Sequence, residues 1–141
     1  MAKLLRTLMS LAFVLGAAAV VVPGTATAAD TAYNTKTQYL AGTPNSGMAD
    51  SCVSRSIYLA AGYYDWGHRM GTGSSVGRAN LYLGADWYTW ADCLDPGDGI
   101  YGHGTTLKAV NHDWPRVEIS RTWRLSRSGT YTWGSFLDPR F

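Results

Sequence analysis

Three stretches of the chain repeat one pattern: IYLAAGYYDWGHRM at 57–70, LYLGADWYTWADCLDP at 81–96 and WRLSRSGTYTWGSFLDP at 123–139. Each copy begins with a short apolar segment and continues through small or turn-forming residues to Tyr-x-Trp. An apolar residue follows four positions later, which gives the pairs Trp66–Met70, Trp90–Leu94 and Trp133–Leu137. Internal similarity of this kind is typical of repeated supersecondary units. We therefore expect the fold to be built from three copies of one unit.

Alternating hydrophobicity predicts strands in and around these copies. Val53, Ile57, Leu59 and Ala61 occupy odd positions, and in 117–125 apolar and polar residues alternate. The short turn-forming gap favours a hairpin in each copy, and Trp-x-x-x-apolar favours one helical turn after it. The sequence pattern of residues 99–110 predicts a further hairpin. The expected fold is all-β, a compact sandwich, barrel or prism of about seven to nine strands built from three hairpin repeats.

The first 28 residues have the parts of a secretory signal peptide. Lys3 and Arg6 form its basic region, an apolar run covers 8–22, and Ala26-Thr27-Ala28 provides the small residues for cleavage. The run of about 15 residues is shorter than the roughly 20 of a membrane-spanning helix. We predict cleavage before Ala29 and a secreted, extracellular protein that has no membrane anchor after cleavage.

Removal of the signal changes the charge of the chain. The full sequence has 12 Lys+Arg and 10 Asp+Glu, and the loss of Lys3 and Arg6 leaves a net charge of zero. A neutral domain gives no electrostatic reason to expect nucleic acid or an anionic membrane as partner. Four aspartates gather in mid-chain, as is typical of a solvated face: Asp86, Asp92, Asp95 and Asp98.

Cys52 and Cys93 are the only cysteines, in a chain expected to reach an oxidising compartment. We predict one disulfide between them, which closes a loop of about 40 residues and contributes on the order of 4 kcal/mol. A small domain with a limited core benefits from such a cross-link.

The catalytic and metal-binding patterns in the sequence lack their usual context. Gly73-Ser74-Ser75-Val76-Gly77 matches G-x-S-x-G, but it lies between repeats of a β protein and not in an α/β sheet. His68, His103 and His112 have no zinc-binding spacing and are expected on surface loops. Residues 95–99 lack the alternating oxygen ligands of a calcium loop. We predict a non-enzymatic protein without a metal or other cofactor.

Residues 29–51 are rich in Ala, Thr, Asn and Ser. This composition predicts a flexible N-terminal arm ahead of a β domain at 52–141. The alternative is that 37–41 adds a strand to a sheet edge or enters a partner's cleft.

After removal of the signal peptide, the chain is rich in aromatic residues, with nine Tyr, six Trp and two Phe. The three repeated Trp are expected in the core. The others suit binding, because Tyr and Trp anchor protein interfaces and also stack on sugars. The candidates are a protein-binding adaptor or protease-inhibitor-like protein, a lectin or cell-wall carbohydrate binder, and a small antimicrobial protein. A lectin built on the repeats would place Asp65, Thr89 and Thr132 in equivalent exposed pockets.

The segments YLAAGYYDW, LYLGADWYTW and SGTYTWGSFLDP, together with the Ala-rich signal, resemble small exported actinobacterial proteins. Among these, the chain is similar to the adaptor subunit of umbrella toxin particles. In that family a compact β protein joins a lectin-bearing, trypsin-like subunit to the stalk of a large toxin, and its N-terminal segment docks into the partner. The resemblance implies that 29–51 binds another secreted protein through Tyr33, Lys36, Tyr39 and Leu40. It makes an adaptor in a toxin-like complex the first hypothesis for function.

Overall fold

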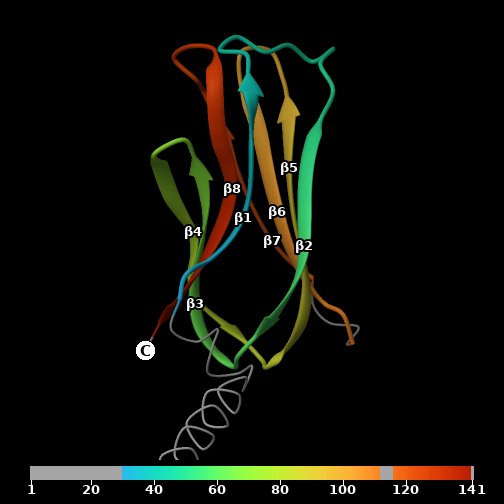
Figure 1. Ribbon diagram of the computed structural model, residues 1–141, viewed down its shortest axis with the longest axis vertical. Coiled ribbons are helices and arrows are strands. Elements are labelled where there is room, and N and C mark those ends of the chain that lie inside the picture. The colour runs from blue at the N-terminus through green and yellow to red at the C-terminus, as the bar shows by residue number, and fades with distance from the viewer. Residues whose placement is uncertain (1–29, 112–115, 141) are drawn as a thin grey trace, which may run out of the picture.

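The computed structural model describes residues 30–111 and 116–140, which form a sandwich of two antiparallel four-stranded sheets (Figure 1). Sheet A has the order β1-β8-β3-β4, and sheet B has the order β2-β5-β6-β7. The predicted all-β class is confirmed, and the architecture is the sandwich. The strands are β1 (Ala32–Leu40), β2 (Ser51–Leu59), β3 (Gly62–Met70), β4 (Gly73–Leu83), β5 (Asp86–Pro96), β6 (Tyr101–Ala109), β7 (Val117–Trp123) and β8 (Gly129–Arg140).

Each repeat crosses from one sheet to the other. The copies correspond to β2–β3, β4–β5 and β7–β8, and in all three the two strands belong to different sheets. The strands of a copy therefore do not pair with each other as a hairpin would. The residues after each Trp continue a strand instead of forming the expected helical turn. Residues i and i+4 lie on the same face in a helix and also in a strand, so the Trp-x-x-x-apolar spacing alone did not distinguish a helical turn from a strand.

The repeated Tyr anchors each crossover to the backbone. Its hydroxyl donates to the carbonyl oxygen four residues earlier, from Tyr64 to Ala60 (2.6 Å), Tyr88 to Gly84 (2.8 Å) and Tyr131 to Arg127 (2.6 Å). This bond is the tyrosine corner of β-sandwiches. Two residues later the repeated Trp is fully buried, as predicted, at Trp66, Trp90 and Trp133. Tyr-x-Trp thus encodes a turn anchor followed by a core residue.

Residues 99–110 contribute one strand and not the expected hairpin. β6 lies between β5 and β7 and buries every second residue from Tyr101 to Ala109. Gly102 and Gly104 fall at the alternate positions, and neither has a positive φ. These glycines therefore serve as small outward-facing strand residues and do not form a turn.

The segment expected to be a flexible arm contains β1. This strand pairs with β8 from Ala32 to Leu40, and it buries Asn34 and Leu40. Within the described residues the β domain therefore begins at Ala32 and not at 52. The added-strand alternative is the one that forms, over a longer range than 37–41 and within the chain's own sheet. The composition concealed it, because even the buried face of β1 carries a polar residue, Asn34.

Cys52 and Cys93 lie opposite each other on β2 and β5 and form the predicted disulfide. A disulfide indicates an oxidising environment. Within residues 30–111 and 116–140, no helix has the length and apolar character needed to cross a membrane. The expected signal peptide lies outside the described residues.

Candidate functional site

A layer of polar side chains crosses the core between two apolar clusters. In every repeat, the residue two positions after the Trp is polar and buried: His68, Asp92 and Ser135. The Trp before this position and the apolar residue that ends the pattern belong to different apolar clusters. One cluster contains Trp66 and Trp90, and the other contains Trp133. Asn34, His103 and Thr105 complete the buried polar layer. The repeat itself carried the sequence signal for this layer, at the position between its Trp and its last apolar residue.

Asp92 is the centre of the polar layer. Its Oδ2 accepts hydrogen bonds from Asn34 Nδ2 and Ser135 Oγ, both at 2.6 Å, and its Oδ1 is bonded to His103 Nε2 at 2.7 Å. Ser135 Oγ also accepts from Trp90 Nε1 at 2.8 Å. A buried carboxylate needs such partners. The expectation that Asp92 belongs to a solvated acidic face is therefore wrong.

His103 is held from both sides. Trp123 Nε1 donates to His103 Nδ1 at 3.0 Å, and since indole N–H only donates, Nδ1 is an acceptor and Nε2–H donates to Asp92. Ser135 is bonded to the carboxylate and not to this imidazole. A nucleophilic triad needs a serine or cysteine on the histidine. The polar layer thus contains the residue types of a triad without its geometry.

His68 packs edge to face on His103, with ring centroids 4.4 Å apart. Neither of its ring nitrogens has a hydrogen-bond partner among the described residues. Burial, with smaller contributions from positive charge at His103 and Arg121, lowers the pKa of His68 to about 3. The expectation of surface histidines is therefore wrong for His68 and His103, while His112 lies outside the described residues.

A second candidate site is the outer face of sheet A, where each strand contributes a ring. We call it the aromatic face, and it consists of Tyr33 (β1), Phe136 (β8), Tyr63 (β3) and Tyr82 (β4) with Arg69. Tyr33 lies opposite Phe136, and Tyr63 lies opposite Tyr82. Tyr63 and Tyr82 meet edge to face at 5.2 Å and are 54% and 55% exposed.

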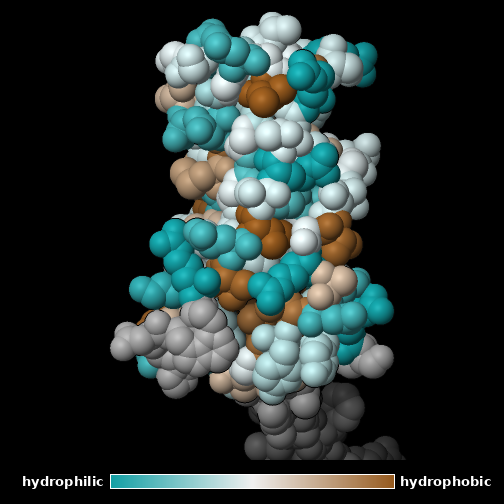
Figure 2. All heavy atoms as spheres, turned by 180° about the vertical axis from the view of Figure 1, so that it is seen from behind, coloured by the Kyte–Doolittle hydropathy of each residue, from teal (hydrophilic) through white to brown (hydrophobic). Residues whose placement is uncertain are grey.

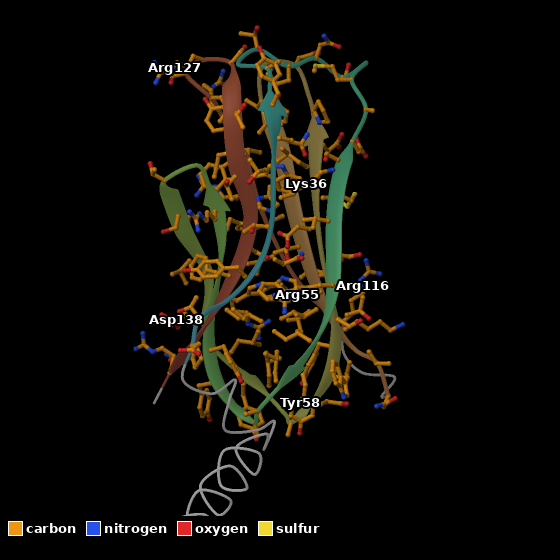
Figure 3. All side chains as sticks on the ribbon, viewed as in Figure 1. Lys36, Arg55, Tyr58, Arg116, Arg127 and Asp138 are labelled. Atoms are coloured by element: carbon orange, nitrogen blue, oxygen red, sulfur yellow. A yellow bond between two sulfur atoms is a disulfide. The ribbon has the colours of Figure 1, made fainter. Side chains whose placement is uncertain are left out.

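A polar hollow of about 260 Å³ lies on this face beside Tyr33 and Phe136. The Phe136 ring lies over Gly67, where a Cβ would come within 2.6 Å of Phe136 Cζ. The guanidinium of Arg69 lies over the Tyr33 ring, 5.6 Å from its centroid. Asp138, labelled in Figure 3, lines the hollow and accepts from Thr31 Oγ1 at 3.1 Å. Charged groups and hydroxyls thus surround two rings.

The four residues implied as partner contacts do not form one site. Tyr33 and Tyr39 are exposed but lie six positions apart on β1, and only Tyr33 lines the hollow. Lys36 Nζ donates to Ser51 Oγ at 3.0 Å, toward β2. Leu40 is 4% exposed and belongs to the core, so that a partner has no access to it.

The free edge of β1 is blocked. Arg55 Nη1 of β2 donates to the Tyr33 carbonyl oxygen at 2.7 Å, and Lys36 occupies the same side through Ser51 (Figure 3). Charged side chains over an edge oppose pairing with another strand. β1 is therefore poorly suited to extend a partner's sheet.

The three positions that a repeated sugar site would use have different surroundings. Asp65 is paired with Arg140 at 2.8 Å, and Thr132 Oγ1 shares a hydrogen bond with Thr37 Oγ1 at 2.8 Å. Thr89 is exposed on the other sheet. They do not line equivalent pockets.

Comparisons with known proteins identify no relative of this chain. No protein-family model matches the chain, and neither a curated protein nor a solved structure matches it.

Proposed function

We propose that the protein is a secreted, non-enzymatic module that binds another protein through the aromatic face. The observation that carries the proposal is the spread of exposed or half-buried rings over all four strands of sheet A, with Arg69 among them. Tyr and Arg are enriched among the residues that dominate protein-binding energy. Tyr63 and Tyr82 lie outside the hollow beside Tyr33, so the rings extend beyond it, which favours a macromolecular partner.

An adaptor role is the finer form of this proposal, and it rests on the resemblance to toxin-particle adaptors. In this form the aromatic face replaces the N-terminal arm as one of two contact surfaces. The disulfide fits assembly outside the cytoplasm. The blocked edge of β1 favours contact through side chains over contact through an added strand.

The test is capture of partners by tagged protein from the native culture supernatant, followed by mass spectrometry. The variant Tyr33→Ser/Tyr63→Ser/Tyr82→Ser should reduce capture of one specific partner about tenfold or more. Tyr58→Ser/Trp87→Ser is the matched control, since it removes the half-buried Tyr58 and the exposed Trp87, a ring pair on sheet B at the same end of the sandwich. An adaptor would lose one partner and retain another. Equal capture by both variants would contradict the proposal.

Carbohydrate is the second candidate ligand, because the hollow places Arg69, Asp138 and hydroxyl groups beside two rings. Sugar sites combine a ring that stacks with groups that bond hydroxyls. If this is the function, Asp138→Asn should weaken sedimentation of the protein with isolated cell walls, whereas Asp98→Asn should not. Failure of the unmodified protein to sediment would discard this candidate.

A further inference from the structure

A larger cavity opens between the sheets on another side of the sandwich. It lies between β4 and β7, which are edge strands of sheet A and sheet B. Its volume is about 600 Å³, within the range of sites that enclose small molecules. Seen from behind, the lower half of the molecule shows apolar side chains interspersed with hydrophilic ones (Figure 2).

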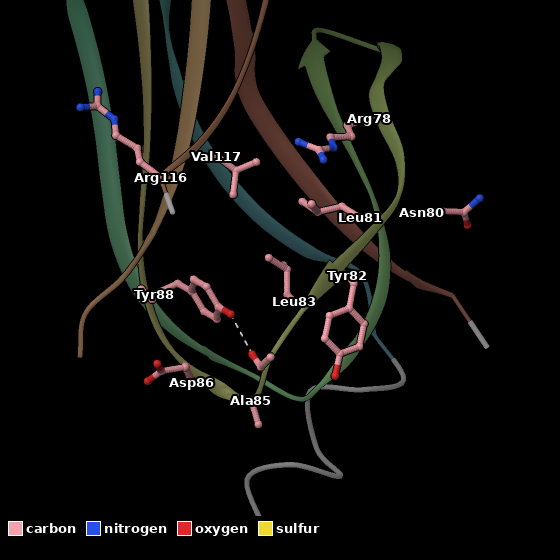
Figure 4. A pocket seen from close by; sticks show the side chains of 12 residues that line it. Arg78, Asn80, Leu81, Tyr82, Leu83, Ala85, Asp86, Tyr88, Arg116 and Val117 are labelled. Carbon is pink, nitrogen blue, oxygen red and sulfur yellow. Dashed lines mark hydrogen bonds between the residues drawn. The ribbon is translucent and has the colours of Figure 1, made fainter. Parts of the chain in front are cut away.

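The walls of this cavity are mainly apolar, with Leu81 and Leu83 of β4, Tyr88 of β5, Ala109 of β6 and Val117 of β7 (Figure 4). Asn80 and Asp86 also line it, and Asp86 Oδ1 accepts hydrogen bonds from Trp87 N and Asn111 Nδ2. The Tyr88 hydroxyl is already bonded to Gly84 O at 2.8 Å, so the residue offers the cavity its ring. A polar ligand group buried against such walls would lose its hydrogen bonds, which favours an alkyl chain as the occupant.

Contact between the two edge strands closes one end of the cavity. A Cβ on Gly77 of β4 would lie 2.7 Å from Ile119 Cδ1 of β7, so the strands touch at this point. On the cavity side of this contact, β7 begins at Val117, and β4 continues to Leu83. The cavity occupies the space where the edges no longer meet.

Charge at the rim gives the occupant a direction. Arg78 is exposed and has no hydrogen bond or ion pair among the described residues, and its side chain points from β4 toward the side of the cavity where Val117 lies (Figure 4). Arg116, also at the rim, is paired with Glu118 at 3.1 Å. An uncompensated guanidinium beside apolar walls complements an anionic head group that carries an apolar tail.

We propose that this cavity binds one free long-chain carboxylate, with its alkyl chain between the sheets and its carboxylate at Arg78. Of the residues that form the aromatic face, Tyr82 also lines this cavity and the other four do not, and this inference goes beyond the proposed protein-binding function. A ligand here would be covered by side chains from four strands, β4 to β7.

The experiment titrates the secreted chain with dodecanoate, and separately with dodecyl maltoside, which has the same tail and a neutral head. We expect saturable one-to-one binding of dodecanoate, with methyl NMR shifts at Leu81, Leu83 and Val117. Arg78→Gln should weaken dodecanoate binding about three- to fivefold, the scale of an exposed ion pair, and leave the maltoside unaffected. Arg127→Gln is the matched control, at the opposite end of the sandwich (Figure 3).

Ala109→Leu adds a test of the cavity itself, because the larger side chain should weaken both ligands while circular dichroism reports the fold. The proposal is overturned if dodecanoate does not saturate, or if Arg127→Gln weakens binding as much as Arg78→Gln. It is also overturned if the protein sediments with phosphatidylglycerol vesicles but ignores monomeric dodecanoate, since that result assigns the surface to a membrane. Loss of partner capture by Tyr33→Ser/Tyr63→Ser, which changes no residue that lines this cavity, with dodecanoate binding intact separates the two functions.

Discussion

At the scale of the residue, His68 is the most unusual side chain in the core. Asp92 and His103 beside it have hydrogen-bond partners, whereas both ring nitrogens of His68 have none among the described residues. A charged imidazole here would face His103 and Arg121, which both disfavour it. The folded protein therefore requires neutral His68.

This requirement predicts acid sensitivity. The pKa of His68 is about 3 in the folded protein and 6.5 when the side chain is unperturbed. Below pH 6.5 the unfolded chain therefore binds a proton that the folded chain rejects, and the free energy of unfolding should fall by up to about 1.4 kcal/mol per pH unit. Urea denaturation at about pH 7 and about pH 5 measures this fall. In His68→Phe the free energy of unfolding should fall less between these two pH values. An equal fall in both proteins would show that His68 does not cause the acid sensitivity.

The buried polar layer shows what sequence reasoning reached at this scale and what it missed. The repeat located the three buried Trp, because their positions recur with the fold. It did not reveal His68, Asp92 and Ser135, which lie two positions after each Trp. In the helical turn that was expected, a residue two positions after the Trp lies on a different face from the Trp. In the strand that forms, both residues face the core.

At the scale of the element, β1 depends on one glycine of its neighbour. Gly134 of β8 has a φ of 149° and lies opposite Thr35. A Cβ at this position would overlap the Asn34 carbonyl oxygen and lie 2.8 Å from Thr35 Cα. β1 can therefore approach β8 only when residue 134 lacks a side chain.

Gly134→Ala should consequently cost about 3 kcal/mol or more in unfolding free energy, within the range of backbone clashes that cannot relax. Amide hydrogen exchange in β1 should accelerate more than exchange in sheet B, because the clash lies at the β1–β8 pairing. Gly104→Ala is the control, since a Cβ there meets no atom within 4 Å and its φ is not positive. Similar losses in both variants would show that glycine entropy, and not the close approach of β1, governs the effect.

At the scale of the whole molecule, local patterns specified strands but not their partners. Alternation in 53–61 and 117–125 marked β2 and β7, and the faces within these strands are as expected, whereas Ala61 lies beyond the end of β2 and is exposed. β1 and β8 pair although they lie at opposite ends of the chain, and no local signal encodes such a pairing. The aromatic face was missed for the same reason, because Tyr33, Tyr63, Tyr82 and Phe136 meet only after the strands are ordered.

The disulfide links β2 to β5, and its removal tests how far the whole fold depends on it. Cys52 and Cys93 are exposed on the outer face of sheet B, so that Cys52→Ser/Cys93→Ser leaves no cavity in the core. The bond spans 41 residues, and the stretch includes β3, β4 and most of β5.

Loss of a constraint this long should lower the free energy of unfolding by about 4 kcal/mol, mainly through greater freedom of the unfolded chain. That origin also predicts a steeper dependence on denaturant, because the unlinked chain exposes more surface when it unfolds. Urea denaturation of the oxidised protein and the double variant measures both quantities. Lower stability with an unchanged slope would place the effect in the folded β2–β5 pair and not in the unfolded chain.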